Sequence, residues 1–350
     1  MAKLIEPRVA SMVARRFAND PKDGAHLTER LRRDLAVAVP RAEQLVASAS
    51  GIETPPPVRW DVITRARWAE ANVTSLTTML KPLADKVAVR LARLPLPVRI
   101  AQRTLVSVEV GVLLGYISRR VLGQYDILVP EGRRKGAAAP LYFVGINMVE
   151  TERRLGFVPE DFALWVAVHE VTHRFQFAGV PWLRPHFLEL VEGYLSSVEI
   201  DSRVLSQRLT TAAKRLISGK VPPDERNPIY LLASPEQRLA FDRIQALMAI
   251  VEGHGNFVMD AVGAQVIPSF ARMRGAFDSR RQQASLVQRV LNNLIGLETK
   301  LRQYELGQAF CEHVARAHGA VAISHLWASP EHIPSLEELK APDKWLSRVA

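Results

Sequence analysis

Residues 161–182, DFALWVAVHEVTHRFQFAGVPW, decide how this chain folds, because a histidine, a glutamate and a second histidine stand at positions 169, 170 and 173. Side chains four residues apart lie on one face of an α-helix, so His169 and His173 can direct a ring nitrogen at the same ion. Apolar residues extend this stripe toward the N-terminus, so the face is expected to turn inward. The spacing therefore predicts a buried helix that holds a metal ion.

Two imidazoles and a neighbouring carboxylate suit a catalytic zinc ion. Zinc binds neutral nitrogen and anionic oxygen donors, and a catalytic site keeps one position open for water. Glu170 can reach that water without competing for the metal, so we expect it to act as the general base. The competing interpretation is a packed amphipathic helix with two satisfied histidines. It leaves a carboxylate and two imidazoles on an apolar helix without a reason to be there.

A third protein ligand is expected from residues 246–263, ALMAIVEGHGNFVMDAVG, which read as an apolar helix carrying Glu252 and His254. Residues two apart on a helix point about 200° away from each other, so only one of them can face the metal. We predict Glu252 as the ligand. His254 is predicted to reach the substrate oxyanion if the flanking glycines distort the helix, or to replace Glu252 as the ligand.

Other polar residues complete or compete with this assignment. Asn256 and Asp260, one and two turns after Glu252, could accept a hydrogen bond from a ligating imidazole. Glu189 and Glu192 follow the second histidine closely enough to be rival ligands. We rank Glu192 second, because its surroundings read as an ordinary amphipathic helix.

The rest of the chain is predicted to be mainly helical. Apolar residues recur at three-to-four spacing through residues 1–120, and helical patterns resume near residue 159. Branched and aromatic residues predict strands at 126–130 and 141–149, which we expect to pair as a hairpin. We expect a helical N-terminal region, 1–120, and a catalytic region, 121–350. Because no long polar linker separates them, they should form one compact α+β unit.

Composition excludes several classes of protein. Of the 350 residues, 48% are hydrophobic and 23% charged, as in an ordinary globular protein. Glu109 and Asp260 interrupt the longest apolar runs, so we predict no membrane-spanning helix. The N-terminal stretch lacks the apolar core of a signal peptide. A single cysteine, Cys311, excludes an internal disulfide and fits the reducing cytoplasm.

The basic balance of the chain does not by itself indicate a nucleic-acid partner. The net charge is +10, but the cations are dispersed in pairs and no basic stretch is interleaved with aromatic residues. We therefore interpret the charge as a solvated basic surface and predict no nucleic-acid binding.

Longer strings around these residues resemble a known family. The sequences HEVTHRFQF from residue 169, EGHGNFVMDAVG from residue 252 and LRQYELGQAF from residue 301 are similar to the zincin-like metallopeptidase family of bacterial proteins, found mostly in actinobacteria. The resemblance covers most of the chain. It implies a zincin fold, in which the helix carrying His169, Glu170 and His173 packs under a small sheet with helices around it. Some relatives are described as hydrolases or are associated with deazaflavin coenzyme biosynthesis. Where the glutamate-ligand zincins carry an acid one turn after the ligand, this chain has Asn256.

The function predicted from the sequence is a cytoplasmic zinc-dependent hydrolase. Within this class we favour a metallopeptidase that acts on a peptide or protein. The alternative is a catalytically silent protein with a zincin fold that serves as a scaffold or interaction partner. That alternative is motivated by a helical portion larger than a minimal zincin needs.

Overall fold

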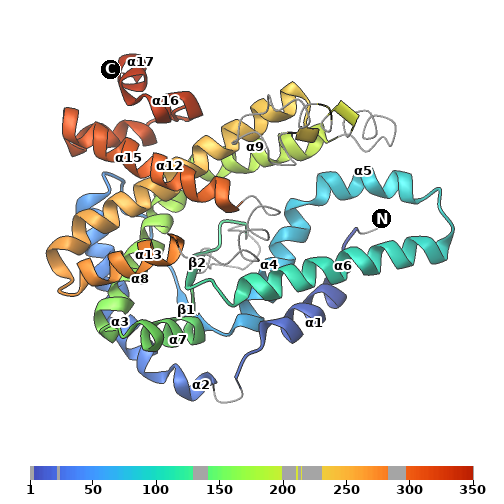
Figure 1. The fold of residues 1–350 in the computed structure, drawn as a ribbon, viewed down its shortest axis with the longest axis horizontal. Coiled ribbons are helices and arrows are strands. Elements are labelled where there is room, and N and C mark those ends of the chain that lie inside the picture. The colour runs from blue at the N-terminus through green and yellow to red at the C-terminus, as the bar shows by residue number, and fades with distance from the viewer. Residues whose placement is uncertain are drawn as a thin grey trace. The chain divides into compact units, whose positions relative to one another are not determined.

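The computed structural model describes residues 4–21, 24–128, 141–198, 231–282 and 297–349, together with residues 210, 211 and 214. They form helices and a three-stranded sheet, so the predicted mainly helical α+β class is confirmed (Figure 1). The chain divides into two compact units, Met1–Val180 with Val258–Arg274, and Pro181–Phe257 with Gly275–Ala350. The N-terminal helices thus share a unit with the helix of the histidine pair. The expected regions, 1–120 and 121–350, stay a prediction.

The first unit contains the whole sheet and the helices from α1 to α8, together with the end of α12 and the start of α13. Its elements are α1 (Pro7–Ala18), α2 (Gly24–Leu27), α3 (Glu29–Ala49), β1 (Trp60–Ile63), α4 (Arg65–Met79), α5 (Lys81–Leu91), α6 (Leu96–Ser118), β2 (Gly123–Tyr125), β3 (Leu141–Val144), α7 (Gly145–Leu155) and α8 (Pro159–Gly179).

The described residues of the second unit form helices joined by short loops, with no strand among them. It contains α9 (Leu183–Ser197), most of α12 (Pro235–Val266), the end of α13 (Phe270–Gln282), α15 (Leu297–His318), the 3-10 helices η2 (Ala320–Trp327) and η3 (Pro330–His332), α16 (Leu336–Lys340) and α17 (Pro342–Val349).

The sheet has the strand order β1-β3-β2. Strand β2 pairs antiparallel with β3, with Tyr125 opposite Leu141. The strand predicted at 126–130 is not found in residues 126–128, because β2 ends at Tyr125, and residues 129–130 lie outside the described residues. Strand β1 runs parallel to β3, with Trp60 opposite Leu141, and had no sequence prediction. Its four residues follow a run of prolines and are too few to show a clear alternation.

The predicted second strand, 141–149, changes into a helix at its midpoint. Strand β3 ends at Val144 and α7 begins at Gly145. A Cβ atom on Gly145 would lie 2.5 Å from the Val62 side chain and 2.7 Å from that of Thr28, so a larger residue here would force one of these side chains to shift. A short apolar run does not distinguish a buried strand from a buried helix, which explains the prediction.

Helix α8 is buried on nearly every side. Fourteen of its 21 residues are buried, as expected for a helix at the centre of a core rather than on its surface. Helix α3 packs along it and presents Leu31, Leu35 and Val39 to the core. Because α8 is enclosed in this way, its buried polar side chains are surrounded by packed protein atoms.

Arg174 on α8 ties this helix to two other segments. Its guanidinium forms an ion pair of 3.0 Å with Glu43 on α3 and donates a hydrogen bond of 2.6 Å to the carbonyl of Pro56. Burial lowers the pKa of Arg174, and Glu43 opposes that shift. The proline-rich stretch before β1 is thereby fastened to α8.

Helices α1 and α6 pack closely because glycines face alanines where they cross. A Cβ atom on Gly111 would lie 2.6 Å from the carbonyl oxygen of Ala10, and one on Gly115 would lie 2.8 Å from that of Ala14. This contact belongs to a core cluster that also contains Trp68. The C-terminal half of α6 is therefore part of the folded unit.

By length and composition alone, α6 could cross a membrane, and no other helix in the described part of the chain passes this test. It has 23 residues, and 22% of its most apolar window is buried. The expectation that the chain has no membrane-spanning helix stays a prediction.

Candidate metal centre

The two histidines of α8 face each other within a single helical turn. His169 Nε2 and His173 Nε2 lie 3.2 Å apart, and the two rings are nearly perpendicular, at 83°. Two nitrogens bound to one tetrahedral zinc at about 2.0–2.1 Å would be separated by about 3.3 Å. The Nε2 atoms are therefore already spaced as ligands of a single ion.

Gln176, one turn further along α8, orients the second histidine. His173 Nδ1 lies 2.8 Å from Gln176 Oε1, and the Gln176 side chain is fully buried. An amide oxygen can only accept here, so His173 Nδ1 carries the proton and donates it. In the neutral ring Nε2 then keeps its lone pair for a metal. Gln176 was not predicted from the sequence, although the HExxHxxQ spacing puts a possible acceptor beside the second histidine.

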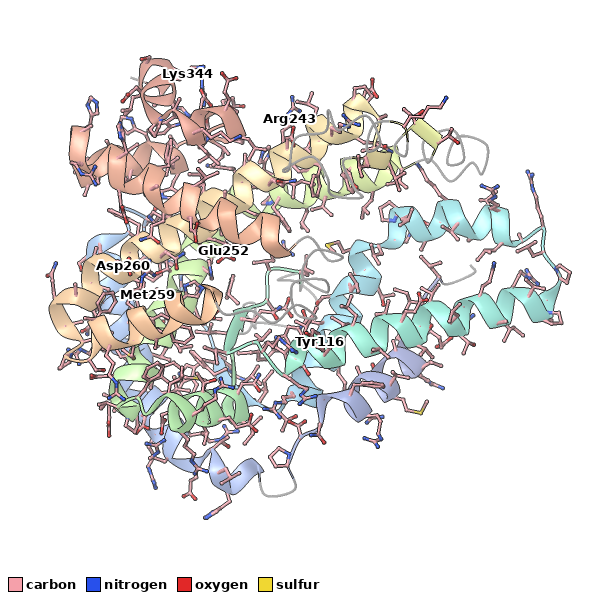
Figure 2. All side chains as sticks on the ribbon, in the orientation of Figure 1. Tyr116, Arg243, Glu252, Met259, Asp260 and Lys344 are labelled. Carbon is pink, nitrogen blue, oxygen red and sulfur yellow. The ribbon has the colours of Figure 1, made fainter. Side chains whose placement is uncertain are left out.

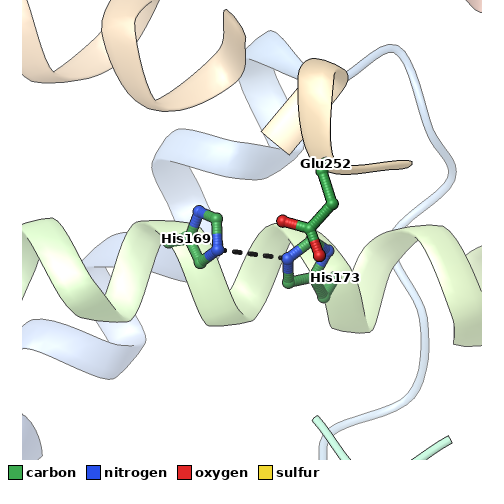
Figure 3. Close-up of side chains that lie close together, drawn as sticks. All are labelled: His169, His173 and Glu252. Atoms are coloured by element: carbon green, nitrogen blue, oxygen red, sulfur yellow. Dashed lines mark hydrogen bonds between the residues drawn. The ribbon is translucent and has the colours of Figure 1, made fainter. Parts of the chain in front are cut away.

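Glu252 on α12 completes a group of three possible ligands. One ligand atom each from His169, His173 and Glu252 lies within 4.8 Å of the other two, and Figure 3 shows the Glu252 carboxylate directed at the histidine pair. Neither Glu192 nor His254, the alternative ligands considered from the sequence, belongs to this group. Two imidazole nitrogens and one carboxylate oxygen are a donor set of the kind that catalytic zinc sites use. The residues present thus fit the expected ion.

The side chains that follow Glu252 on α12 have other surroundings. Figure 2 labels Glu252, Met259 and Asp260 along this helix. Asp260 was predicted to orient an imidazole, and the structure shows it in an ion pair of 3.2 Å with Arg274. Asn256 is buried. Gln176, in contrast, lies within hydrogen-bond distance of the His173 ring.

Glu170 is buried beside the first histidine and packs against the edge of the sheet. Only 6% of its surface is exposed. A Cβ atom on Gly123 of β2 would lie 2.6 Å from Glu170 Cγ and 2.7 Å from Cδ. The backbone of this edge strand therefore forms one wall of the Glu170 site. Gly123 has no sequence signal of its own, since the contact joins residues distant in the chain.

His254 lies in a different environment from Glu252. Its side chain is fully buried, and its ring centre lies 5.0 Å from that of Trp327 on η2 in an edge-to-face arrangement. Edge-to-face contacts of this kind are typical of packing between rings. Glu252 belongs to the group with the two histidines, while His254 packs beside Trp327. Side chains two residues apart on a helix point about 200° away from each other, so different surroundings are expected for the two.

One family of proteins and one solved structure are similar to this chain. The family model described as "zincin-like metallopeptidase" matches residues 5–346. A crystal structure of a protein from Chloroflexus aurantiacus, described as a "putative hydrolase with a novel fold", is similar to this chain, with 32% sequence identity and a TM-score of 0.68. The similarity covers 98% of each chain. None of the curated proteins compared with the chain matches it.

Proposed function

Because this chain belongs to the zincin-like metallopeptidase family, we propose that it is a zinc-dependent hydrolase whose substrates are peptides or proteins. The family and the similar protein from Chloroflexus aurantiacus support hydrolysis as the class of reaction. The observation that carries the proposal is the group formed by His169, His173 and Glu252. Their chemistry, two nitrogens and one carboxylate oxygen, is what a hydrolytic zinc site requires.

In this proposal His169 and His173 hold zinc through Nε2, and Glu252 holds it through a carboxylate oxygen. Gln176 keeps the His173 ring in the tautomer that leaves Nε2 unprotonated. When bound, the zinc ion supplies a Lewis acid that acidifies water and polarises a carbonyl group.

Glu170 is the proposed general base. Its carboxylate takes a proton from the attacking water as the water oxygen forms a bond to the carbonyl carbon. The same proton then passes from Glu170 to the leaving nitrogen as the carbon–nitrogen bond breaks, which returns Glu170 to its ionised form. Burial of Glu170 against Gly123 limits the positions that its carboxylate can take. We give His254 no part in these steps, because its ring packs against Trp327.

Metal analysis combined with one substitution tests the proposal. Purified protein is expected to contain about one zinc per chain, and Glu170→Gln is expected to keep the metal and lose hydrolysis of a peptide library by roughly 10³-fold or more. Glu160→Gln changes an exposed carboxylate on the same helix and should leave both properties unchanged. A protein that neither contains nor binds zinc would overturn the proposal.

The second candidate is a catalytically silent scaffold with the same fold. The size of the second unit favours it, since among the residues given a role in the proposed reaction this unit contributes Glu252 alone. Zinc binding without turnover of any peptide, and identical behaviour of the wild type and Glu170→Gln, would support the scaffold instead of the hydrolase.

A cytoplasmic location is part of the proposal and rests on cysteine usage. Cys311 is fully buried on α15, and burial raises the pKa of its thiol. Fractionation of cells expressing the chain would test this location.

We also propose that nucleic acid is not a partner of this chain. A gel-shift assay that shows salt-dependent binding would contradict this proposal.

A further inference from the structure

Exposed large apolar side chains are concentrated in one segment of the first unit. Six of the twelve exposed large hydrophobic residues in the described part of the chain lie between positions 89 and 105. They are Val89, Leu94, Leu96, Val98, Ile100 and Leu105. Single exposed apolar residues are ordinary, whereas a cluster of this size marks an interaction site. We call residues 89–105 the α5–α6 tip.

The tip is a helical bend with little support from the rest of the fold. Helix α5 buries none of its residues. In α6 the buried residues begin only at Ser107. The bend between the helices contains Pro95, and α6 has Pro97 in its first turn. Figure 1 shows α5 and α6 running away from α1 and α4 toward this bend. An eleven-residue helix without a buried face is only marginally stable in water. Contact with a partner that covers its apolar residues would stabilise it.

The charge around the tip is almost entirely positive. Residues 81–105 contain six basic residues, Lys81, Lys86, Arg90, Arg93, Arg99 and Arg103, and one acidic residue, Asp85. Asp85 pairs with Lys81, and Arg103 pairs with Glu6. Arg90 and Arg93 are exposed next to the apolar cluster. A partner for this surface must accept apolar side chains and also carry negative charge.

We propose that the α5–α6 tip docks onto the surface of an anionic lipid bilayer. Leu94, Leu96 and Ile100 enter the boundary between headgroups and acyl chains, and the surrounding cations contact acidic headgroups. A short apolar segment flanked by Lys and Arg is the composition of interfacial membrane-binding helices. A second copy of this chain would bring the same positive charge to the contact and is therefore disfavoured by repulsion.

Docking is interfacial and does not involve a spanning α6. The C-terminal half of α6 is held against α1 through Gly111 and Gly115. Ser107 accepts a hydrogen bond of 2.8 Å from the backbone of Glu6. Insertion of the whole helix would break these contacts, whereas insertion of the tip leaves them in place.

Vesicle sedimentation of the full chain tests the proposal. The protein is expected to bind vesicles of phosphatidylglycerol and phosphatidylcholine, to bind pure phosphatidylcholine weakly, and to dissociate at high salt. The double variant Leu96→Glu with Ile100→Glu should bind the anionic vesicles about tenfold more weakly or worse. Val37→Glu with Val321→Glu is the matched control, because Val37 and Val321 are 72% and 80% exposed elsewhere, and it should bind as the wild type does.

Two further variants separate lipid from protein as the occupant. Arg90→Gln with Arg93→Gln keeps the apolar cluster and should lose the preference for phosphatidylglycerol. A fluorophore sensitive to polarity on the Leu96→Cys variant should shift to the blue with anionic vesicles, while the same label on Val37→Cys should not. The buried Cys311 leaves the introduced thiol as the reactive one. Absence of vesicle binding, or light scattering that shows a dimer broken by Leu96→Glu with Ile100→Glu, would overturn the proposal.

Discussion

Gly123 on the edge strand and Glu170 on the central helix approach so closely that a Cβ atom on Gly123 would lie 2.6 Å from Glu170 Cγ. The flexible Glu170 side chain must therefore move if a methyl group is added at position 123. We expect Gly123→Ala to keep the fold and the metal but to lower hydrolysis by about 10²-fold, as displacement of a general base should. Peptide turnover and zinc content together check this. Turnover equal to that of the wild type would contradict it.

Gln176 should control metal affinity rather than folding. Gln176→Leu removes the acceptor of the His173 Nδ1 proton, and loss of such a partner weakens metal binding by about 10- to 100-fold. Competition with a chelator measures the change. Gln176→Glu keeps an acceptor at the same place and is expected to restore affinity, so equal weakening by both substitutions would count against the orienting role.

Gly307 on α15 should be essential for the packing of the second unit. A Cβ atom on Gly307 would overlap the carbonyl of Ala249 on α12, and backbone atoms cannot move aside as a side chain can. Gly307→Ala is expected to lower the free energy of unfolding by about 1–3 kcal/mol, or more. Gly193→Ala on α9 is the control, since nothing lies within 4 Å of its Cβ position. Helix propensity predicts that the control is more stable by up to about 1 kcal/mol. Denaturation in urea measures both.

Asp34 on α3 should make stability depend on pH. Burial raises the pKa of its carboxyl above the ordinary value of 3.8, Arg30 opposes that shift and Glu160 adds to it. Folding thus favours the protonated form, so the Asp34 contribution to stability falls as pH rises from 3.8 through the raised pKa. Asp34→Asn should therefore gain stability relative to the wild type as pH approaches neutrality. Unfolding in urea across this range measures the difference, and a variant that loses stability relative to the wild type toward neutral pH would contradict the prediction.

The site divides into a part that local sequence predicts and a part that only the tertiary structure determines. His169, Glu170 and His173 lie within two turns of one helix, so their spacing is enough to predict their shared location. Because a regular helix separates Glu252 and His254 by roughly 200°, the sequence predicts that only one of them faces the histidine pair, but the angle does not say which. Gly123 was not predictable, because its contact with Glu170 depends on where a three-residue edge strand lies.

The fold shows the same division. Helices with clear apolar periodicity were expected where they occur, whereas β1 was missed and the strand at 141–149 was predicted to be too long. Strand β1 is defined by its parallel pairing with β3, and its four residues show no clear alternation of apolar and polar side chains. Where β3 changes into α7, Gly145 packs against the side chains of Val62 and Thr28, which leave no room for a Cβ atom. Both features follow from tertiary contacts that short sequence windows do not contain.

The proposed ligands come from two helices, α8 and α12, that are far apart along the chain. An unfolded chain offers only two neighbouring imidazoles on one segment and binds an ion weakly, so tight capture requires the native arrangement. Zinc should then act as a thermal stabiliser: the melting temperature would rise with the concentration of free ion and fall when a chelator strips it away.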